Sequence, residues 1–264
     1  MTNTNQFNNQ KVAELKILND FINLEESIVP WATHESMVRL LRQKSEQLRC
    51  FQNLVSCFEP QQDKFMCGPS TIAMILNSIE KSKLFTRAKA ITTSDLPIDK
   101  FAEKFARLQN RGLEKNFNAS FKRFTQKNIF NQNCSKVKKL KELYSPPFGL
   151  CLEEIEKIIN ALSYKAQRFH AVPSLDINFY RNIFKKSLSS DSQYIILNYD
   201  QRALGQLDGG GHIAPVAAYD ETTDSVLIID VNPELGWSWI ALSSLCKAMA
   251  TEDKRKPRGF VLVS

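Results

Sequence analysis

A cysteine at the start of an apolar helix is the residue best placed for chemistry in this chain. Cys67-Gly68-Pro69-Ser70 leads into a segment whose apolar residues recur with helical spacing. Pro69 suits a first helical turn, where its missing N–H is not needed. The unpaired N–H groups at a helix N-terminus carry partial positive charge, which favours a thiolate there. Cys67 is therefore predicted to be a nucleophile rather than a buried structural cysteine.

A histidine and an aspartate far along the chain can supply the base and the orienting group of a triad. His212 opens a predicted strand over 213–219, and Asp230 lies at the end of a second predicted strand over 226–231. If this hairpin turns about Glu221, the two side chains are directly opposed and share a face. A slip of two residues leaves them on one face, whereas a slip of one separates them.

Gln61 lies just upstream of the cysteine. Its side-chain amide can donate to an oxyanion, together with the backbone N–H of Cys67. Each of these residues alone is a weak signal, because a lone histidine on an apolar strand is usually a core residue. The order Gln61, Cys67, His212, Asp230 is more specific, and the chain has only three histidines.

In these segments the chain resembles the phytochelatin synthase family, in the short bacterial form that has the catalytic domain only. The Cys-Gly helix alone would fit many papain-like peptidases. The Gly-Gly-His-Ile-Ala-Pro strand, the Asp-Val pair and the closing Arg-Gly-Phe-Val narrow the resemblance. It covers most of 51–264 with one insertion, through the Cys67 helix, 124–130, 149–154, 198–199, 205–206, the His212 strand, 230–231, 248–249 and 258–261.

The resemblance implies a papain-like fold and an enzyme, a glutathione γ-glutamylcysteinyltransferase or cysteine peptidase. Such enzymes remove glycine from glutathione through a thiol acyl-enzyme and pass the γ-glutamylcysteinyl group to water or to a second glutathione. It also implies that Asn198, Asp253 and Arg258 bind the γ-glutamyl group, the arginine through a forked contact to its carboxylate. No cofactor is expected for acylation. In metal detoxification, a cadmium or zinc ion would enter as a metal–glutathione substrate.

One departure from the family pattern concerns the acceptor. After the Asp-Val pair the family usually continues with Arg, then Tyr and Lys, then paired prolines, whereas this chain has Asn232-Pro233-Glu234-Leu235-Gly236. Basic residues that could bind a second, anionic glutathione are missing there, so hydrolysis is expected to outweigh transpeptidation. The cysteine-rich C-terminal extension of the plant and yeast enzymes is also missing, and metal sensing through such a tail is not expected.

Composition is that of a protein with a substantial core and no membrane span. The chain has 264 residues, of which 43% are hydrophobic, and no apolar run long enough to cross a bilayer. Residues 1–10 are polar and lack the pattern of a signal peptide. The six cysteines are scattered, with no Cys-x-x-Cys pair, so neither a zinc site nor a disulfide framework is indicated. We expect a cytoplasmic protein, with non-classical export and a homodimer left open.

The order of predicted elements, helices first and antiparallel strands later, indicates an α+β fold. The nucleophile would lie on a helical lobe and the His and Asp on a sheet lobe. We expect a polar tail and helical extension over 1–50, and a catalytic domain over 51–264 with a basic insertion at about 81–123. Helices are predicted over 10–24, 36–48, 99–108, 135–143 and 152–162, and strands over 193–199, 213–219, 226–231 and 260–263.

Two other functions remain open. A bacteriocin-processing type of papain-like peptidase also has a Gln and a Cys-Gly-Pro helix start, and would hydrolyse an α-peptide after a small residue. A non-enzymatic module could bind nucleic acid or an anionic membrane surface through 81–141, which holds 16 Lys and Arg against 4 Asp and Glu. For that block we favour a solvated helical face with buried phenylalanines.

Overall fold

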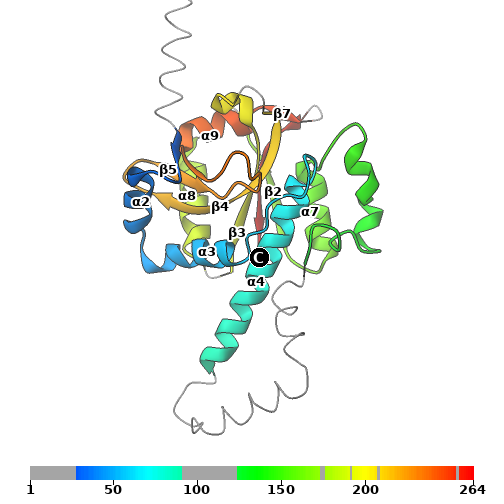
Figure 1. Ribbon diagram of the computed structural model, residues 1–264, viewed down its shortest axis with the longest axis horizontal. Coiled ribbons are helices and arrows are strands. Elements are labelled where there is room, and N and C mark those ends of the chain that lie inside the picture. Colours follow the sequence, from blue (N-terminus) through cyan, green and yellow to red (C-terminus); the bar gives the residue numbers. More distant parts are fainter. Residues whose placement is uncertain (1–27, 91–123, 173–175, 191, 207–208, 254–255) are drawn as a thin grey trace, which may run out of the picture.

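A seven-stranded antiparallel sheet forms the centre of the molecule (Figure 1). This computed structural model describes residues 28–90, 124–172, 176–190, 192–206, 209–253 and 256–264. Along the sheet the strands follow the order β1-β6-β5-β4-β3-β9-β2, and β7 and β8 form a separate pair. Their bounds are β1 Ile28–Pro30, β2 Ala166–His170, β3 Tyr194–Asp200, β4 Gly211–Asp220, β5 Ser225–Ile228, β6 Ser238–Ala241, β7 Glu252–Asp253, β8 Lys256–Pro257 and β9 Gly259–Val263.

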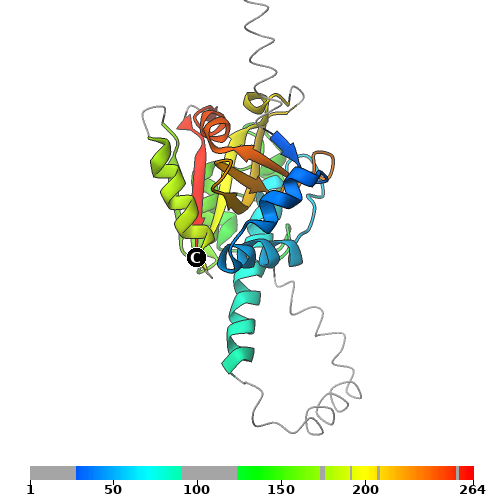
Figure 2. The same cartoon turned by 90° about the vertical axis from the view of Figure 1, so that its left-hand side faces the viewer.

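Helices pack against the sheet and against one another: α4 contacts α3 and α7, and α8 contacts α3 and α9 (Figure 2). Every residue of β3 is buried, which explains its nearly continuous apolar run where a half-exposed strand would alternate. The helices are α2 His34–Leu41, α3 Ser45–Ser56, α4 Cys67–Ala90, α7 Leu152–Ala161, α8 Ile177–Leu188 and α9 Leu242–Met249, with short 3-10 helices η1 Cys134–Lys136, η2 Leu140–Tyr144 and η3 Gln201–Leu204.

Helix α4 passes through the core and then projects from the body (Figure 1). Its first turns are buried on all sides, and Ile72, Ile75 and Leu76 are fully buried. A helix that is buried all round is enclosed by other elements. The N-terminal end of α4, where Cys67 lies, is therefore held rigidly by the surrounding elements.

The α+β fold class is confirmed, and β3, β4, β5, β9 and α7 lie where the sequence predicts them. Two predicted helices are wrong as single elements. The segment 36–48 is divided between α2 and α3, because the Gln47 side chain accepts a hydrogen bond from the Lys44 backbone N–H and begins a new helix. The segment 135–143 is divided between η1 and η2. The helices predicted over 10–24 and 99–108 lie outside the described residues.

The N-terminal part of the described chain belongs to the sheet. Strand β1 pairs with β6 at the sheet edge. The Trp239 indole N–H also donates to the Ser36 carbonyl of α2 at 3.2 Å.

In the part of the chain that the structure describes, no helix is long and apolar enough to cross a bilayer.

Candidate active site

Cys67 is the first residue of α4 and is buried, with 7% of its surface exposed. The Ser70 N–H donates to the Met66 carbonyl at 2.9 Å, and Pro69 occupies the first turn. The sulfur therefore lies at the positive end of a helix of 24 residues. This is the placement that the sequence predicted.

The N-terminus of α4 packs closely on β4 beside His212. A Cβ on Gly68 would lie 3.1 Å from Ile213 Cδ1 and 3.0 Å from Leu150 Cδ1, so a larger residue would push the two elements apart. Thr71 Oγ1 donates to the Ile213 carbonyl at 3.1 Å. Because Ile213 follows His212 on β4, these contacts fix the Cys67 thiol relative to the His212 imidazole.

His212 and Asp230 form a buried pair, each 5% exposed. His212 Nε2 lies 2.7 Å from Asp230 Oδ1, which leaves Nδ1 for the thiol of Cys67. The Asn232 backbone N–H donates to the same Oδ1 at 2.7 Å, and the Tyr199 hydroxyl donates to Oδ2 at 3.3 Å. The carboxylate is thus fixed on both oxygens and can hold the imidazole in one orientation.

The pair is arranged to keep His212 charged. Burial opposes protonation of His212, but hydrogen bonds to Asp230 and Cys67 outweigh it and raise the pKa of His212 to about 10. At neutral pH an imidazolium therefore lies beside Cys67 and supplies the counter-charge that a thiolate nucleophile requires. Burial, then the Asp230 charge, raises the pKa of Tyr199 well above its usual value, so its hydroxyl remains a neutral donor.

The register predicted for the β4–β5 hairpin is wrong. The chain does not turn about Glu221, because Tyr219 pairs with Val226. If that register continued along the strands, His212 and Asp230 would lie on opposite faces of the sheet. The triad would then be impossible.

A β-bulge at Ala217 returns the His212 and Asp230 side chains to the same face of the sheet. Val216 pairs with Ile228, so Ala217 is an extra residue on β4. Beyond the bulge the pairing has moved by one residue, and His212 and Asp230 become diagonal neighbours on one face. Relative to the predicted register, the pairing near His212 and Asp230 is therefore shifted by two residues, which leaves both side chains on one face.

Gln61 lies on the wall of the cavity that contains Cys67. Its backbone N–H donates to the Val231 carbonyl at 2.8 Å, which ties this segment to the residue after Asp230. Its side-chain Nε2 donates to the Asp63 carbonyl at 3.0 Å. A primary amide has two N–H groups, so one remains for an oxyanion.

Sequence reasoning gave no role to Gln126, which supports the Gln61 segment from the protein interior. Gln126 is fully buried; its Oε1 accepts from the Gln62 N–H at 3.0 Å and its Nε2 donates to the Pro60 carbonyl at 2.9 Å. Tyr199 was missed as well. Both residues lie in segments that resemble the family, 124–130 and 198–199, and this resemblance could have indicated their importance.

Gln61→Ala is expected to lower kcat by roughly a hundred- to a thousandfold with little change in KM, because one oxyanion donor is lost. Steady-state release of glycine from glutathione measures this. Gln62→Ala is the matched control, since the exposed Gln62 side chain lies on the same cavity. A loss confined to Gln62→Ala would transfer the role to that residue.

Cys67 and His212 line one cavity of about 980 Å³. Its walls come from six segments, mostly loops and strand ends, several of which are far apart in the sequence. The lining residues include 61–65, Cys67, 147–150, Asn198, Gln201, 209–213, 232–234, Asp253 and Arg258. A volume of this size accommodates a peptide-sized ligand.

Asn198, Asp253 and Arg258, which we call the Arg258 cluster, meet at this cavity. Arg258 Nη1 donates to Asn198 Oδ1 at 2.9 Å and lies 3.5 Å from Asp253 Oδ2. Asn198 Nδ2 donates to the same Asp253 oxygen at 3.2 Å. A Cβ on Gly211 would lie 2.6 Å from Arg258 Nη1, so this glycine lets the guanidinium lie against the strand of His212. The cluster offers a guanidinium and a carboxylate at fixed separation.

The basic block over 81–141 is described only in part, since residues 91–123 lie outside the described residues. In the described part, Lys138 is 5% exposed. Its Nζ donates to the Gly149 carbonyl at 2.6 Å and lies 3.3 Å from Glu154 Oε1. This lysine therefore supports the 147–150 wall of the cavity and is not available to a nucleic acid.

A sequence model of the phytochelatin synthase family matches residues 20–97 and 99–260 of the chain. The chain belongs to the phytochelatin synthase family. The matched ranges include every residue of the triad, Gln61 and the Arg258 cluster. The resemblance inferred from the sequence is thus confirmed for most of the chain.

Among curated proteins, the chain is similar to plant glutathione gamma-glutamylcysteinyltransferases. It is 26% identical over 220 residues to glutathione gamma-glutamylcysteinyltransferase 1 of Lotus japonicus, covering 82% of this chain and 36% of the relative. It is 24% identical over 217 residues to glutathione gamma-glutamylcysteinyltransferase 2 of Arabidopsis thaliana, covering 81% of this chain and 39% of the relative. The chain thus spans somewhat over a third of the length of these relatives.

Proposed function

We propose that this chain is a papain-like enzyme that removes glycine from glutathione and transfers the γ-glutamylcysteinyl group to water or to a second glutathione. The observation that carries the proposal is a single cavity lined by Cys67, by His212 and by the Arg258 cluster, with Asp230 hydrogen-bonded to His212 behind its wall. Family membership and the names of the relatives support it. A buried triad alone would fit many peptidases, whereas the adjacent cluster suits an α-amino-acid group.

Glutathione has such a group at its γ-glutamyl end, with an ammonium beside an α-carboxylate. The Arg258 guanidinium can bind the carboxylate through two parallel hydrogen bonds. Asp253 can accept from the ammonium, and the Asn198 amide can bond either group. Because these three side chains already bond one another, the substrate replaces existing contacts and does not leave a buried charge unpaired.

In the acylation step, the Cys67 sulfur attacks the carbonyl carbon of the cysteinyl–glycine bond. The developing oxyanion accepts from the Gln61 Nε2 and the Cys67 backbone N–H. The His212 imidazolium then donates its Nδ1 proton to the glycine nitrogen as the C–N bond breaks. Glycine leaves, and a thioester joins the γ-glutamylcysteinyl group to Cys67.

In the deacylation step, His212 is neutral and acts as the base. It takes a proton from a water molecule or from the amine of a second glutathione as that nucleophile attacks the thioester. The tetrahedral intermediate collapses with loss of the Cys67 thiolate. Water yields γ-glutamylcysteine, and glutathione yields a peptide longer by one γ-glutamylcysteinyl unit.

Hydrolysis is expected to exceed transfer. Positioning an acceptor can be worth several kcal/mol of barrier, and the 232–234 wall of the cavity offers no basic residue. Among the described lining residues the cations are Lys64 and Arg258, and Arg258 is held in its cluster. Incubation with millimolar glutathione, with and without cadmium or zinc, followed by mass analysis, should give γ-glutamylcysteine and glycine as main products.

Two outcomes of that assay would contradict the expectation. Predominant (γ-glutamylcysteine)n-glycine oligomers would show that an acceptor site exists, and Lys64→Gln would be the first variant to test it. No glycine release under any condition would overturn the glutathione function. A panel of short Gly-Gly peptides would then identify a bacteriocin-processing type of peptidase.

Arg258→Lys is expected to raise KM for glutathione by about tenfold with a smaller effect on kcat. Lysine keeps the charge but cannot hold Asn198 and a carboxylate through a fork. Steady-state kinetics measure this, and circular dichroism confirms that the variant folds. An unchanged KM would place the γ-glutamyl group elsewhere in the cavity.

We also propose that 51–264 is the catalytic domain and that it contains the basic insertion at about 81–123. Residues 28–50 pack on this domain through β1 and α2. A reducing compartment suits the chain, because its six cysteines, all within the described residues, are free. A salt-dependent shift of labelled DNA or binding to anionic liposomes would favour a further binding role for the basic block.

A further inference from the structure

Asp63 accepts four hydrogen bonds that fix the loop leading into α4. Its Oδ1 accepts from the Phe65 N–H at 3.0 Å, and its Oδ2 accepts from the Tyr144 hydroxyl at 2.6 Å. Its carbonyl oxygen accepts from Gln61 Nε2 at 3.0 Å and from the Met66 N–H at 3.1 Å. The side chain of Asp63 thus holds a backbone oxygen that in turn holds the Gln61 amide.

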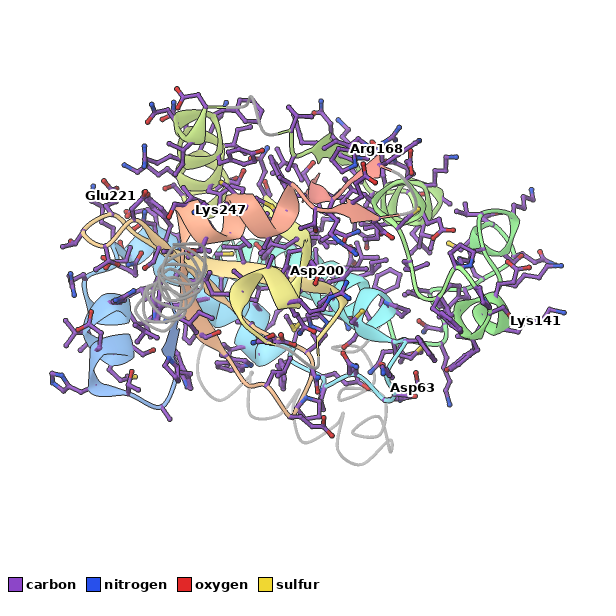
Figure 3. All side chains as sticks on the ribbon, turned by 90° about the horizontal axis from the view of Figure 1, so that it is seen from above. Asp63, Lys141, Arg168, Asp200, Glu221 and Lys247 are labelled. Atoms are coloured by element: carbon purple, nitrogen blue, oxygen red, sulfur yellow. The ribbon has the colours of Figure 1, made fainter. Side chains whose placement is uncertain are left out.

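The bond to Tyr144 is a tertiary link. Tyr144 ends η2 and lies 81 residues from Asp63 in the sequence. In Figure 3, Asp63 and Lys141 of η2 lie on the same side of the molecule. The Phe65 ring packs edge-on against the Tyr144 ring, with centroids 5.7 Å apart, and stacks on Phe148 at 5.0 Å. These aromatic contacts reinforce the link beside the cavity.

Tyr144 is presented from a segment that is itself anchored. The Gly149 N–H donates to the Leu143 carbonyl at 3.0 Å, and Lys138 Nζ donates to the Gly149 carbonyl at 2.6 Å. The hydrogen bond to Asp63 raises the pKa of Tyr144, so its hydroxyl remains a donor. A short O–H···O⁻ bond of this kind is among the stronger hydrogen bonds in proteins.

The Gln61 side-chain amide has a hydrogen-bond donor, Nε2, and a hydrogen-bond acceptor, Oε1. Its Nε2 is bonded to Asp63, whereas its Oε1 is buried with no hydrogen-bond partner among the described residues. If the Asp63 carbonyl moved, the amide could rotate and present an acceptor where an oxyanion needs a donor. The position of that carbonyl therefore decides whether Gln61 stabilises or repels the oxyanion.

We propose that Asp63 is a positioning residue of the oxyanion hole, and that its carboxylate, held by Tyr144, fixes the orientation of the Gln61 amide. The proposal rests on the acyl-transfer function proposed above, in which Gln61 is the donor. It predicts that Asp63 and Tyr144 affect kcat through Gln61 and leave substrate binding and the Cys67–His212 pair unchanged.

Kinetics on three variants test the link. Asp63→Ala is expected to lower kcat by roughly 10- to 100-fold, since a donor misplaced by about 1 Å loses most of its effect. Tyr144→Phe should lower kcat by about 2- to 10-fold, as loss of one hydrogen bond implies. KM and the rate of Cys67 alkylation by iodoacetamide should stay within about twofold of wild type. Tyr164→Phe is the matched control, because it removes a similar hydroxyl–carboxylate bond, to Glu80 at 2.7 Å, away from the cavity lining.

A double-mutant cycle with Gln61→Ala separates positioning from general support of the fold. In the Gln61→Ala background, Asp63→Ala should cause little further loss of kcat, because the group that it positions is already gone. Additive losses, or equal losses in Asp63→Ala and Tyr164→Phe, would overturn the proposal.

Amide hydrogen exchange tests the link without any substrate. Exchange in the segment 61–66 should rise in Asp63→Ala and in Tyr144→Phe, and should be unchanged in Tyr164→Phe. Unchanged exchange in the first two variants would overturn the proposal. If wild-type enzyme releases no glycine from glutathione, the proposed function fails while the exchange data still decide whether Asp63 fixes the loop.

Discussion

Cys67→Ala is expected to abolish glycine release from glutathione. The variant removes the sulfur that begins α4, so no thioester can form and neither branch of the reaction can proceed. Mass analysis of the wild-type protein trapped at low pH should show an adduct of γ-glutamylcysteinyl mass on the peptide that contains Cys67. The variant should show no adduct and no free glycine above the uncatalysed rate.

Cys57→Ala is the matched control for this prediction. Cys57 is also buried and lies ten positions earlier, at the C-terminal end of α3 and outside the cavity lining. Its loss should change stability slightly and leave turnover close to that of wild type. Retained turnover in Cys67→Ala together with lost turnover in Cys57→Ala would show that the nucleophile is assigned wrongly.

His212→Ala is expected to lower kcat by roughly a thousand- to ten-thousandfold, since one group acts as acid in the first step and as base in the second. Asp230→Asn should cost less, because Asp230 orients the imidazole and does not itself react. Glycine release under saturating glutathione measures both variants.

His34→Ala serves as the control, since this exposed histidine begins α2 away from the cavity. It should retain wild-type kcat. The assignment of the base fails if His212→Ala keeps more than about a tenth of wild-type kcat, because acid–base catalysis typically contributes at least a hundredfold. A loss in Asp230→Asn larger than that in His212→Ala would indicate that Asp230 has a role beyond orientation.

Most of the proposed chemical assignment rests on local sequence. Cys67 begins a helix because Gly68-Pro69 is followed by residues with helical apolar spacing, and the structure places α4 there. His212 and Asp230 were paired because two β-branched apolar runs flank a polar turn. These are short-range signals, since they depend on backbone preferences and on the burial of one face.

The register of the β4–β5 hairpin could not be predicted from the sequence. The structure has its turn displaced from Glu221 and an extra residue at Ala217. Each change alone would alter which face a side chain points to, and together they keep His212 facing Asp230. The position of a bulge depends on packing against both faces of the strand, and β4 is buried at every residue after Gly211. A local sequence pattern does not show that packing.

The same limit applies to the Asp63–Tyr144 bond and to the division of the predicted 36–48 helix. Sequence alone predicted the α+β class, which the structure confirms, and it is the source of the proposal that Cys67, His212 and Asp230 act as nucleophile, base and orienting group. Both inferences follow from residue type and local periodicity. Tertiary structure decided that Asn198, Asp253 and Arg258 meet in the cavity beside Cys67 and His212, and that a tyrosine 81 residues away bonds Asp63 in the loop before α4. Contacts over such separations depend on how whole elements pack, and only the folded chain brings those elements together.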